Sequence, residues 1–154
     1  MRIVVDTNVM ISAVLWLGTP HRIVELAEKK QVVLCMTQPM LDELREVLQR
    51  RKFQRYLEMR HTSVEEIVYA LLPLVELYAP TAVADIALAD PDDEIFLGCA
   101  ISADASFLVS GDDHLLRLKQ CGKIKIVTPS DFLREAHLGD DEDETITRKP
   151  SAQT

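Results

Sequence analysis

The sequence has few cysteines and few aromatic residues, and it lacks any long apolar run. Cys35, Cys99 and Cys121 are widely spaced and form no CxxC pair, so we expect buried free thiols in a reducing compartment and no thiolate zinc site. No apolar run approaches the ~18 residues of a transmembrane helix, and residues 1–20 contain no charged segment followed by a long apolar one, so we expect neither a transmembrane helix nor a signal peptide. We therefore expect a cytoplasmic protein that does not associate with a membrane.

The sequence also lacks an excess of positive over negative charge. Its formal net charge is 17 − 25 = −8 at pH 7, whereas proteins that coat nucleic acids need positive charge to contact phosphates. The charge therefore argues against a general nucleic-acid coat protein. It does not exclude an enzyme in which bound divalent cations reverse the sign of the site.

What the sequence does contain is a regular alternation of short apolar segments and amphipathic ones. Strands are expected at residues 2–5, 32–36, 107–109 and 124–127. Helices are expected at about residues 8–17, 19–30, 37–51, 63–78, 90–103 and 129–136. The strand segments are apolar without clear alternation, which is typical of parallel strands covered on both faces.

This order of elements predicts an α/β domain of three layers, α/β/α, around a mostly parallel sheet of four to five strands. The domain is expected to span residues 1–138. The segment 139–154 carries five acids against two bases and has no periodicity, so we expect it to be a flexible acidic and polar tail.

Acidic residues directly follow two of the expected strands. Asp6 comes directly after the strand expected at 2–5. Asp112 comes after the strand expected at 107–109, from which it is separated by Ser110 and Gly111. Ligands of such sheets bind outside the carboxyl ends of the strands, so these acids meet at one edge if both strands are central. A simpler interpretation is open for each, since Asp6 can cap the next helix and SGDD is rich in turn-forming residues.

Two further acids lie on expected helices. Glu43 neighbours Met40 and Val47 at helical spacing and so sits beside the apolar stripe, where it could also pair with a nearby base. Asp93 shares the inward face of its helix and Asp92 does not, although an acid in the first turn also favours the helix dipole. The sequence leaves the choice between Asp92 and Asp93 open, and we favour Asp93 because of this face.

Together these acids predict a metal site. Carboxylates at close range raise each other's pKa, and a divalent cation offsets that cost. Ligand sets made only of oxygen atoms favour Mg²⁺ or Mn²⁺. His114 follows the last acids, and we interpret it as a surface or turn residue.

The most basic stretch of the chain is QRRKFQRY, residues 49–56. It could hold an RNA strand by phosphate contacts and stacking, or it could be a solvated helix end at which cations favour the dipole. The candidate RNA-binding residues are Arg50, Arg51, Lys52 and Arg55.

The segments VVDTNV, LDEL, DPDDEIFLGCA and LVSGDDHLL, in this order and with TPSDFL near the end, resemble the PIN-domain ribonucleases. The likeness extends over about residues 1–133 and is to the toxin components of toxin–antitoxin pairs, relatives of the VapC toxins. It implies a PIN-like fold and a metal-dependent endoribonuclease that hydrolyses RNA phosphodiester bonds with Mg²⁺ or Mn²⁺. It further implies an RNA substrate, a small antitoxin protein as partner, and a homodimer.

The resemblance also assigns roles to residues by their position. The implied catalytic and metal-binding residues are Asp6, Glu43, Asp93 and Asp112, and the implied supporting residues are Asn8 and Ser110.

Two other functions are compatible with parts of the sequence. A haloacid-dehalogenase-like phosphatase also has an aspartate after its first strand, but its D-x-D-x-T motif is broken here by Asn8 and Met10. The other alternative is a non-catalytic PIN-like module that binds RNA or protein. The presence of all four acids argues against such a module.

Overall fold

The computed structural model describes residues 1–81 and 93–136. Within them, one six-stranded sheet has the order β3-β2-β1-β4-β6-β5. All neighbouring strands in it are parallel except β5 and β6, which are antiparallel. The strands are β1 (Arg2–Val5), β2 (Val33–Thr37), β3 (Val75–Tyr78), β4 (Phe107–Val109), β5 (Gln120–Cys121) and β6 (Ile124–Val127).

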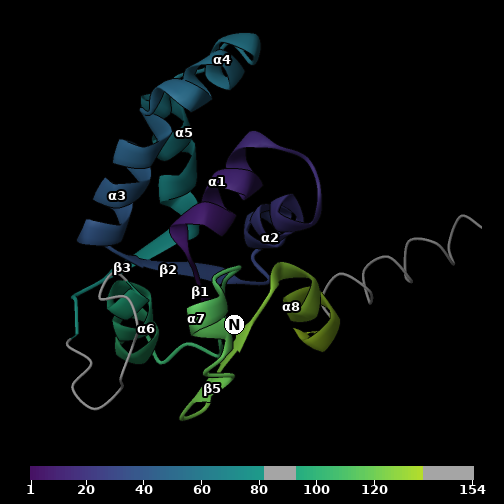
Figure 1. The fold of residues 1–154 in the computed structure, drawn as a ribbon, viewed down its shortest axis with the longest axis vertical. Coiled ribbons are helices and arrows are strands. Elements are labelled where there is room, and N and C mark those ends of the chain that lie inside the picture. Colours follow the sequence, from purple (N-terminus) through teal and green to yellow (C-terminus); the bar gives the residue numbers. More distant parts are fainter. Residues whose placement is uncertain (82–92, 137–154) are drawn as a thin grey trace, which may run out of the picture.

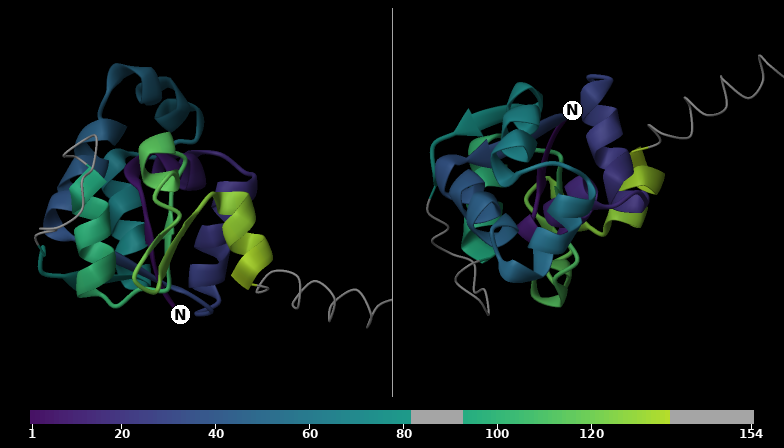
Figure 2. Two further views of the ribbon diagram at one scale, coloured as in Figure 1. Left: turned by 60° about the horizontal axis from the view of Figure 1, so that its bottom comes forward. Right: turned by 90° about the horizontal axis from the view of Figure 1, so that it is seen from above.

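Helices cover both faces of this sheet. In Figure 1, α1, α3 and α5 lie on one side of the sheet and α6 lies on the other. Figure 2 shows α8 beside α2, and these two helices are in contact. The expected three-layer α/β/α architecture is therefore confirmed. The helices are α1 (Thr7–Leu15), α2 (Thr19–Glu28), α3 (Gln38–Leu48), α4 (Arg51–Met59), α5 (Val64–Leu71), α6 (Asp93–Ser102), α7 (Asp113–Leu116) and α8 (Pro129–Ala136).

The core between these layers is mainly aliphatic. Ile3 and Leu108 from the central strands and Leu97 from α6 are fully buried. Phe107 and Phe132 pack edge to face with their ring centroids 5.2 Å apart and so fix α8 against β4. In the part of the chain that the structure describes, no helix combines the length and the apolar character needed to cross a bilayer.

Two expected helices are wrong in their extent. The helix expected at 63–78 ends at Leu71 and is followed by a 3₁₀ turn, Leu72–Leu74, and by β3. Pro73 in that turn lacks the N–H that a continuing helix would need. The helix expected at 37–51 spans only Gln38–Leu48, because the backbone of Arg50 is extended, with φ −63° and ψ 146°. Helix α4, which begins after Arg50, was not predicted from the sequence.

The sheet also has more strands than the four to five expected. Strand β3 lies at the edge and is partly exposed, so it has no apolar run, and β5 has only two residues. Both extend the sheet at its margins and leave the parallel centre as expected. Asp92 and the segment 139–154 lie outside the described residues, and so does the end of the expected domain after residue 136.

Candidate metal centre

A cleft of about 330 Å³ opens where β1 and β4 end. Among the described residues that line it, five are acids and one is a base. The four acids singled out in the sequence are all in this lining, although they come from four separate segments. The lining residues are Asp6, Thr7, Asn8, Glu43, Glu46, Val47, Arg50, Asp93, Phe96 and Asp112.

Asp6 is both a helix cap and a wall of the cleft. It follows β1 directly, and its Oδ1 accepts a hydrogen bond of 2.8 Å from the backbone N–H of Val9, which caps α1. Its Oδ2 accepts hydrogen bonds from the Ser110 hydroxyl at 2.5 Å and from the Gly111 N–H at 3.4 Å. The cap of α1 and the hydrogen bonds to the residues after β4 therefore use different oxygen atoms of one carboxyl group.

The surroundings of Asp6 act on its pKa in opposite directions. Burial raises the pKa of Asp6 most, while the hydrogen bonds from Ser110, Val9 and Gly111 lower it and the charge of Asp112 raises it further. The net direction is upward, so the negative form is disfavoured when no cation is nearby. Asp6 is only 5% exposed, so bulk water does little to relieve this cost.

Ser110 links two of the acids. It is fully buried, and while its hydroxyl donates to Asp6, the same oxygen accepts a hydrogen bond of 2.9 Å from the Asp112 N–H. Asp112 in turn caps α7 by accepting a hydrogen bond of 2.7 Å from the N–H of His114. The end of β4 therefore holds Asp112 in a fixed relation to Asp6.

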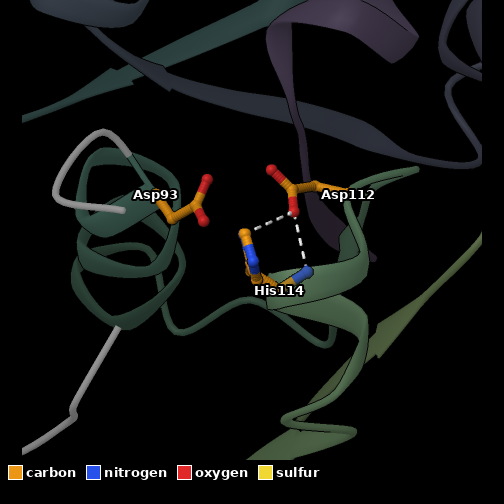
Figure 3. Close-up of side chains that lie close together, drawn as sticks. All are labelled: Asp93, Asp112 and His114. Carbon is orange, nitrogen blue, oxygen red and sulfur yellow. Dashed lines mark hydrogen bonds and ion pairs between the residues drawn. The ribbon is translucent and has the colours of Figure 1, made fainter. Parts of the chain in front are cut away.

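Asp93 approaches the same point from another element. It is the first residue of α6 and is 4% exposed. Figure 3 shows its carboxyl group facing Asp112 and His114, which come from the start of α7. One ligand atom from each of these three residues lies within 4.8 Å of the other two. Carboxylate oxygens suit Mg²⁺ and Mn²⁺, and this group fits a divalent cation.

Glu43 occupies another part of the cleft. It is half-buried on α3, and its Oε2 accepts a hydrogen bond from the Thr7 hydroxyl at the start of α1. Asn8, the next residue of α1, is exposed and also lines the cleft. Glu43 and Asp6 thus share the cleft with the three-residue group but do not belong to it.

The four basic candidates separate into two places. Arg50 lines the cleft, at the break between α3 and α4. Arg51, Lys52 and Arg55 are exposed on α4 and do not line it.

Sequence reasoning assigned no role to three residues in or beside the cleft. His114 is exposed, in agreement with its interpretation as a surface residue, yet its ring lies within reach of Asp93 and Asp112. Neither Thr7 nor Glu46 was proposed as a site residue, since Thr7 was given no role and Glu46 points away from the apolar stripe of its helix. Thr7 directly follows Asp6, and Glu46 lies one helical turn from both Glu43 and Arg50, so spacing could have indicated both.

A family model of the PIN domain matches residues 2–114, and the chain therefore belongs to the PIN-domain family. This confirms the resemblance seen in the sequence and removes the haloacid-dehalogenase alternative. Among solved structures, the fold is similar to the crystal structure of VapBC2 from Rickettsia felis bound to a DNA fragment from their promoter. The match has a TM-score of 0.55 and 15% identity, and it covers 82% of this chain and 97% of the other. A search of curated proteins found no match.

Proposed function

We propose that this protein is a metal-dependent endoribonuclease that hydrolyses RNA phosphodiester bonds. The observation that supports this most is the gathering of Asp6, Glu43, Asp93 and Asp112 in one cleft of a PIN domain. Acids from four separate segments would repel one another there without a cation. A non-catalytic binding module would have no need of them.

Each part of the cleft has a role in this proposal. Asp93 and Asp112, with His114 beside them, would hold Mg²⁺ or Mn²⁺, and Asp6 and Glu43 would complete the acidic surroundings. A bound ion would lower the pKa of a water molecule and offset charge on the phosphate. Ser110 and Thr7 hold the carboxyl groups of Asp6 and Glu43 in place.

Arg50 has a distinct role, since it is the one base among the described lining residues. A guanidinium group can bind a phosphate with two parallel hydrogen bonds. Arg50 would therefore hold a phosphate of the RNA at the rim of the cleft. Arg51, Lys52 and Arg55 would add contacts to the backbone farther along the strand.

We further propose that the protein acts as the toxin of a toxin–antitoxin pair, with a small antitoxin protein as partner and a homodimer as the active form. The similarity of the fold to the crystal structure of VapBC2 supports this role. Expression of the chain alone should then arrest growth, and co-expression of its antitoxin should restore it.

The test of the enzymatic proposal is cleavage of a mixed RNA pool by the wild type and by single variants. With Mg²⁺ or Mn²⁺ the wild type should produce fragments with 5′-phosphate ends, and a chelator should stop the reaction. Asp6→Asn and Asp93→Asn should abolish cleavage. Asp113→Asn is the matched control, because Asp113 is exposed and lies outside the cleft lining, and it should cleave as the wild type does.

Substantial cleavage by Asp6→Asn or Asp93→Asn would contradict these assignments. If no preparation cleaves RNA while the wild type still binds it, the non-catalytic module would be the better description.

A further inference from the structure

Helix α4 is a basic surface on an acidic protein. Residues 50–60 contain five bases and one acid, in a chain whose net charge is −8. Arg51, Lys52 and Arg55 are exposed, and none of them has an acidic partner among the residues that the structure describes. Figure 1 shows α4 at the end of α3 and α5 that is remote from the sheet. Such a surface attracts polyanions.

The same surface contains aromatic rings. Tyr56 of α4 and Trp16, which follows α1, meet edge to face with their ring centroids 5.2 Å apart. Trp16 also meets the buried Phe53 at 6.4 Å, so the pair is fixed to the body of the protein. Tyr56 nevertheless remains 38% exposed and Trp16 36% exposed. Aromatic rings beside cations are the combination that binds unpaired bases and the phosphates between them.

This surface is continuous with the acidic cleft. Arg50 lines the cleft and immediately precedes α4. Tyr56 lies six residues farther along, which corresponds to a rise of about 9 Å on a helix. A strand whose phosphate is held by Arg50 can therefore reach the aromatic pair within a short distance of the cleft.

We propose that α4 and Trp16 form a binding track for single-stranded RNA on one side of the bond that is cut. In this track a base stacks on the Tyr56–Trp16 pair, and Arg51, Lys52 and Arg55 contact the phosphates. The cleft would then act on RNA whose flank is unpaired, because a base within a duplex cannot stack on a protein ring. This inference rests on the proposed nuclease function.

A second copy of this chain is a less suitable occupant of the surface. A twofold interface places the same patch of both subunits together, and here it would bring two cationic helices face to face. RNA instead complements both the charge and the rings.

The test measures RNA binding rather than cleavage, in a chelator, with a short fluorescent single-stranded RNA. Tyr56→Ala should weaken binding roughly tenfold, because the base loses the ring on which it stacks. Tyr56→Phe keeps the ring and should bind as the wild type does. Tyr69→Ala is the matched control, because Tyr69 is 78% exposed on α5 and is not part of this surface, and it should have no effect.

Charge is tested separately, by the salt dependence of the same binding. Arg55→Gln should reduce the slope of log affinity against log salt by about 0.7, the value for one phosphate contact with a single strand. An RNA duplex of the same length should bind equally well to the wild type and to Tyr56→Ala, because it offers no base for stacking.

The results distinguish this inference from the proposed function. If the variants show the expected pattern in RNA binding but no RNA is cut, the track stands and the nuclease proposal fails. If RNA is cut and Tyr56→Ala binds it as tightly as the wild type, the track is wrong. A change of oligomeric state or of protein binding in Tyr56→Ala, with unchanged RNA affinity, would assign the surface to a protein partner and overturn the inference.

Discussion

Ser110 offers a sharp test of how the cleft is held together. Its hydroxyl lies between two acids, donating to Asp6 at 2.5 Å and accepting from the Asp112 N–H at 2.9 Å, and the residue is fully buried. Ser110→Ala removes both hydrogen bonds and little else. The substitution should therefore lower the free energy of unfolding and allow the carboxyl groups of Asp6 and Asp112 to move relative to each other.

The size of the effect follows from these contacts. A hydrogen bond to a charged group contributes about 1.5–3 kcal/mol, and a buried donor left unsatisfied costs about 1–3 kcal/mol. The second cost, that of the Asp112 N–H left without its acceptor, is smaller than for a fully buried group, because Asp112 is half-buried and water can reach it. We expect Ser110→Ala to lower the free energy of unfolding by about 2–3 kcal/mol. That is a large share of the roughly 5–15 kcal/mol typical of a domain.

Urea denaturation at pH 7 in a chelator measures this loss, with Ser130→Ala as the control. Ser130 is exposed on α8, so its variant should stay within about 0.5 kcal/mol of the wild type. Ser110→Ala should also weaken Mn²⁺ binding by roughly 10–100-fold, as substitution of an outer contact of a metal site does. If Ser110→Ala unfolds at the wild-type urea concentration, the hydrogen-bonded link between the acids contributes nothing and the reasoning is refuted.

Two other predictions concern the core. Burial raises the pKa of Cys35 to about 11 and that of Cys99 to about 12, from the ordinary 9.0, so iodoacetamide at pH 8 should modify the partly exposed Cys121 first. Because both thiols are neutral in the fold, their contribution to stability is present below pH 9 and falls as the pH rises toward 11. Equal labelling of all three cysteines in native protein, read by mass spectrometry, would contradict this burial. Leu97→Ala should lower the free energy of unfolding by about 2–5 kcal/mol in urea, since Leu97 is fully buried, and a loss below 1 kcal/mol would argue against the packing of α6.

The parts of the cleft that could be predicted from the sequence are those that local pattern determines. Asp6 and Asp112 follow short apolar strands, and parallel strands bring their carboxyl ends to one edge. Helical spacing places Glu43 beside an apolar stripe and Asp93 on an inward face, and both line the cleft.

The remaining parts depend on contacts between distant segments. Arg50 lines the cleft whereas Arg51, Lys52 and Arg55 lie on α4, and the break between α3 and α4 that separates them is not visible in the basic pattern of the sequence. The hydrogen bond from the Thr7 hydroxyl to the Glu43 carboxylate depends on how α1 and α3 pack together. Trp16 and Tyr56 are forty residues apart, and only the fold shows that they meet.

Calorimetric titration of Mn²⁺ into the metal-free protein at pH 7 tests the central claim most directly. The account predicts saturable binding to the wild type and to Asp113→Asn. Asp93→Asn should bind Mn²⁺ more than about tenfold more weakly than the wild type. A loss of about tenfold is expected when a residue that only supports a metal ligand is replaced, and Asp93 is assigned here as a ligand itself. Equal Mn²⁺ affinity in the wild type and Asp93→Asn, or no binding by the wild type, would show that the acids of this cleft do not form a metal centre.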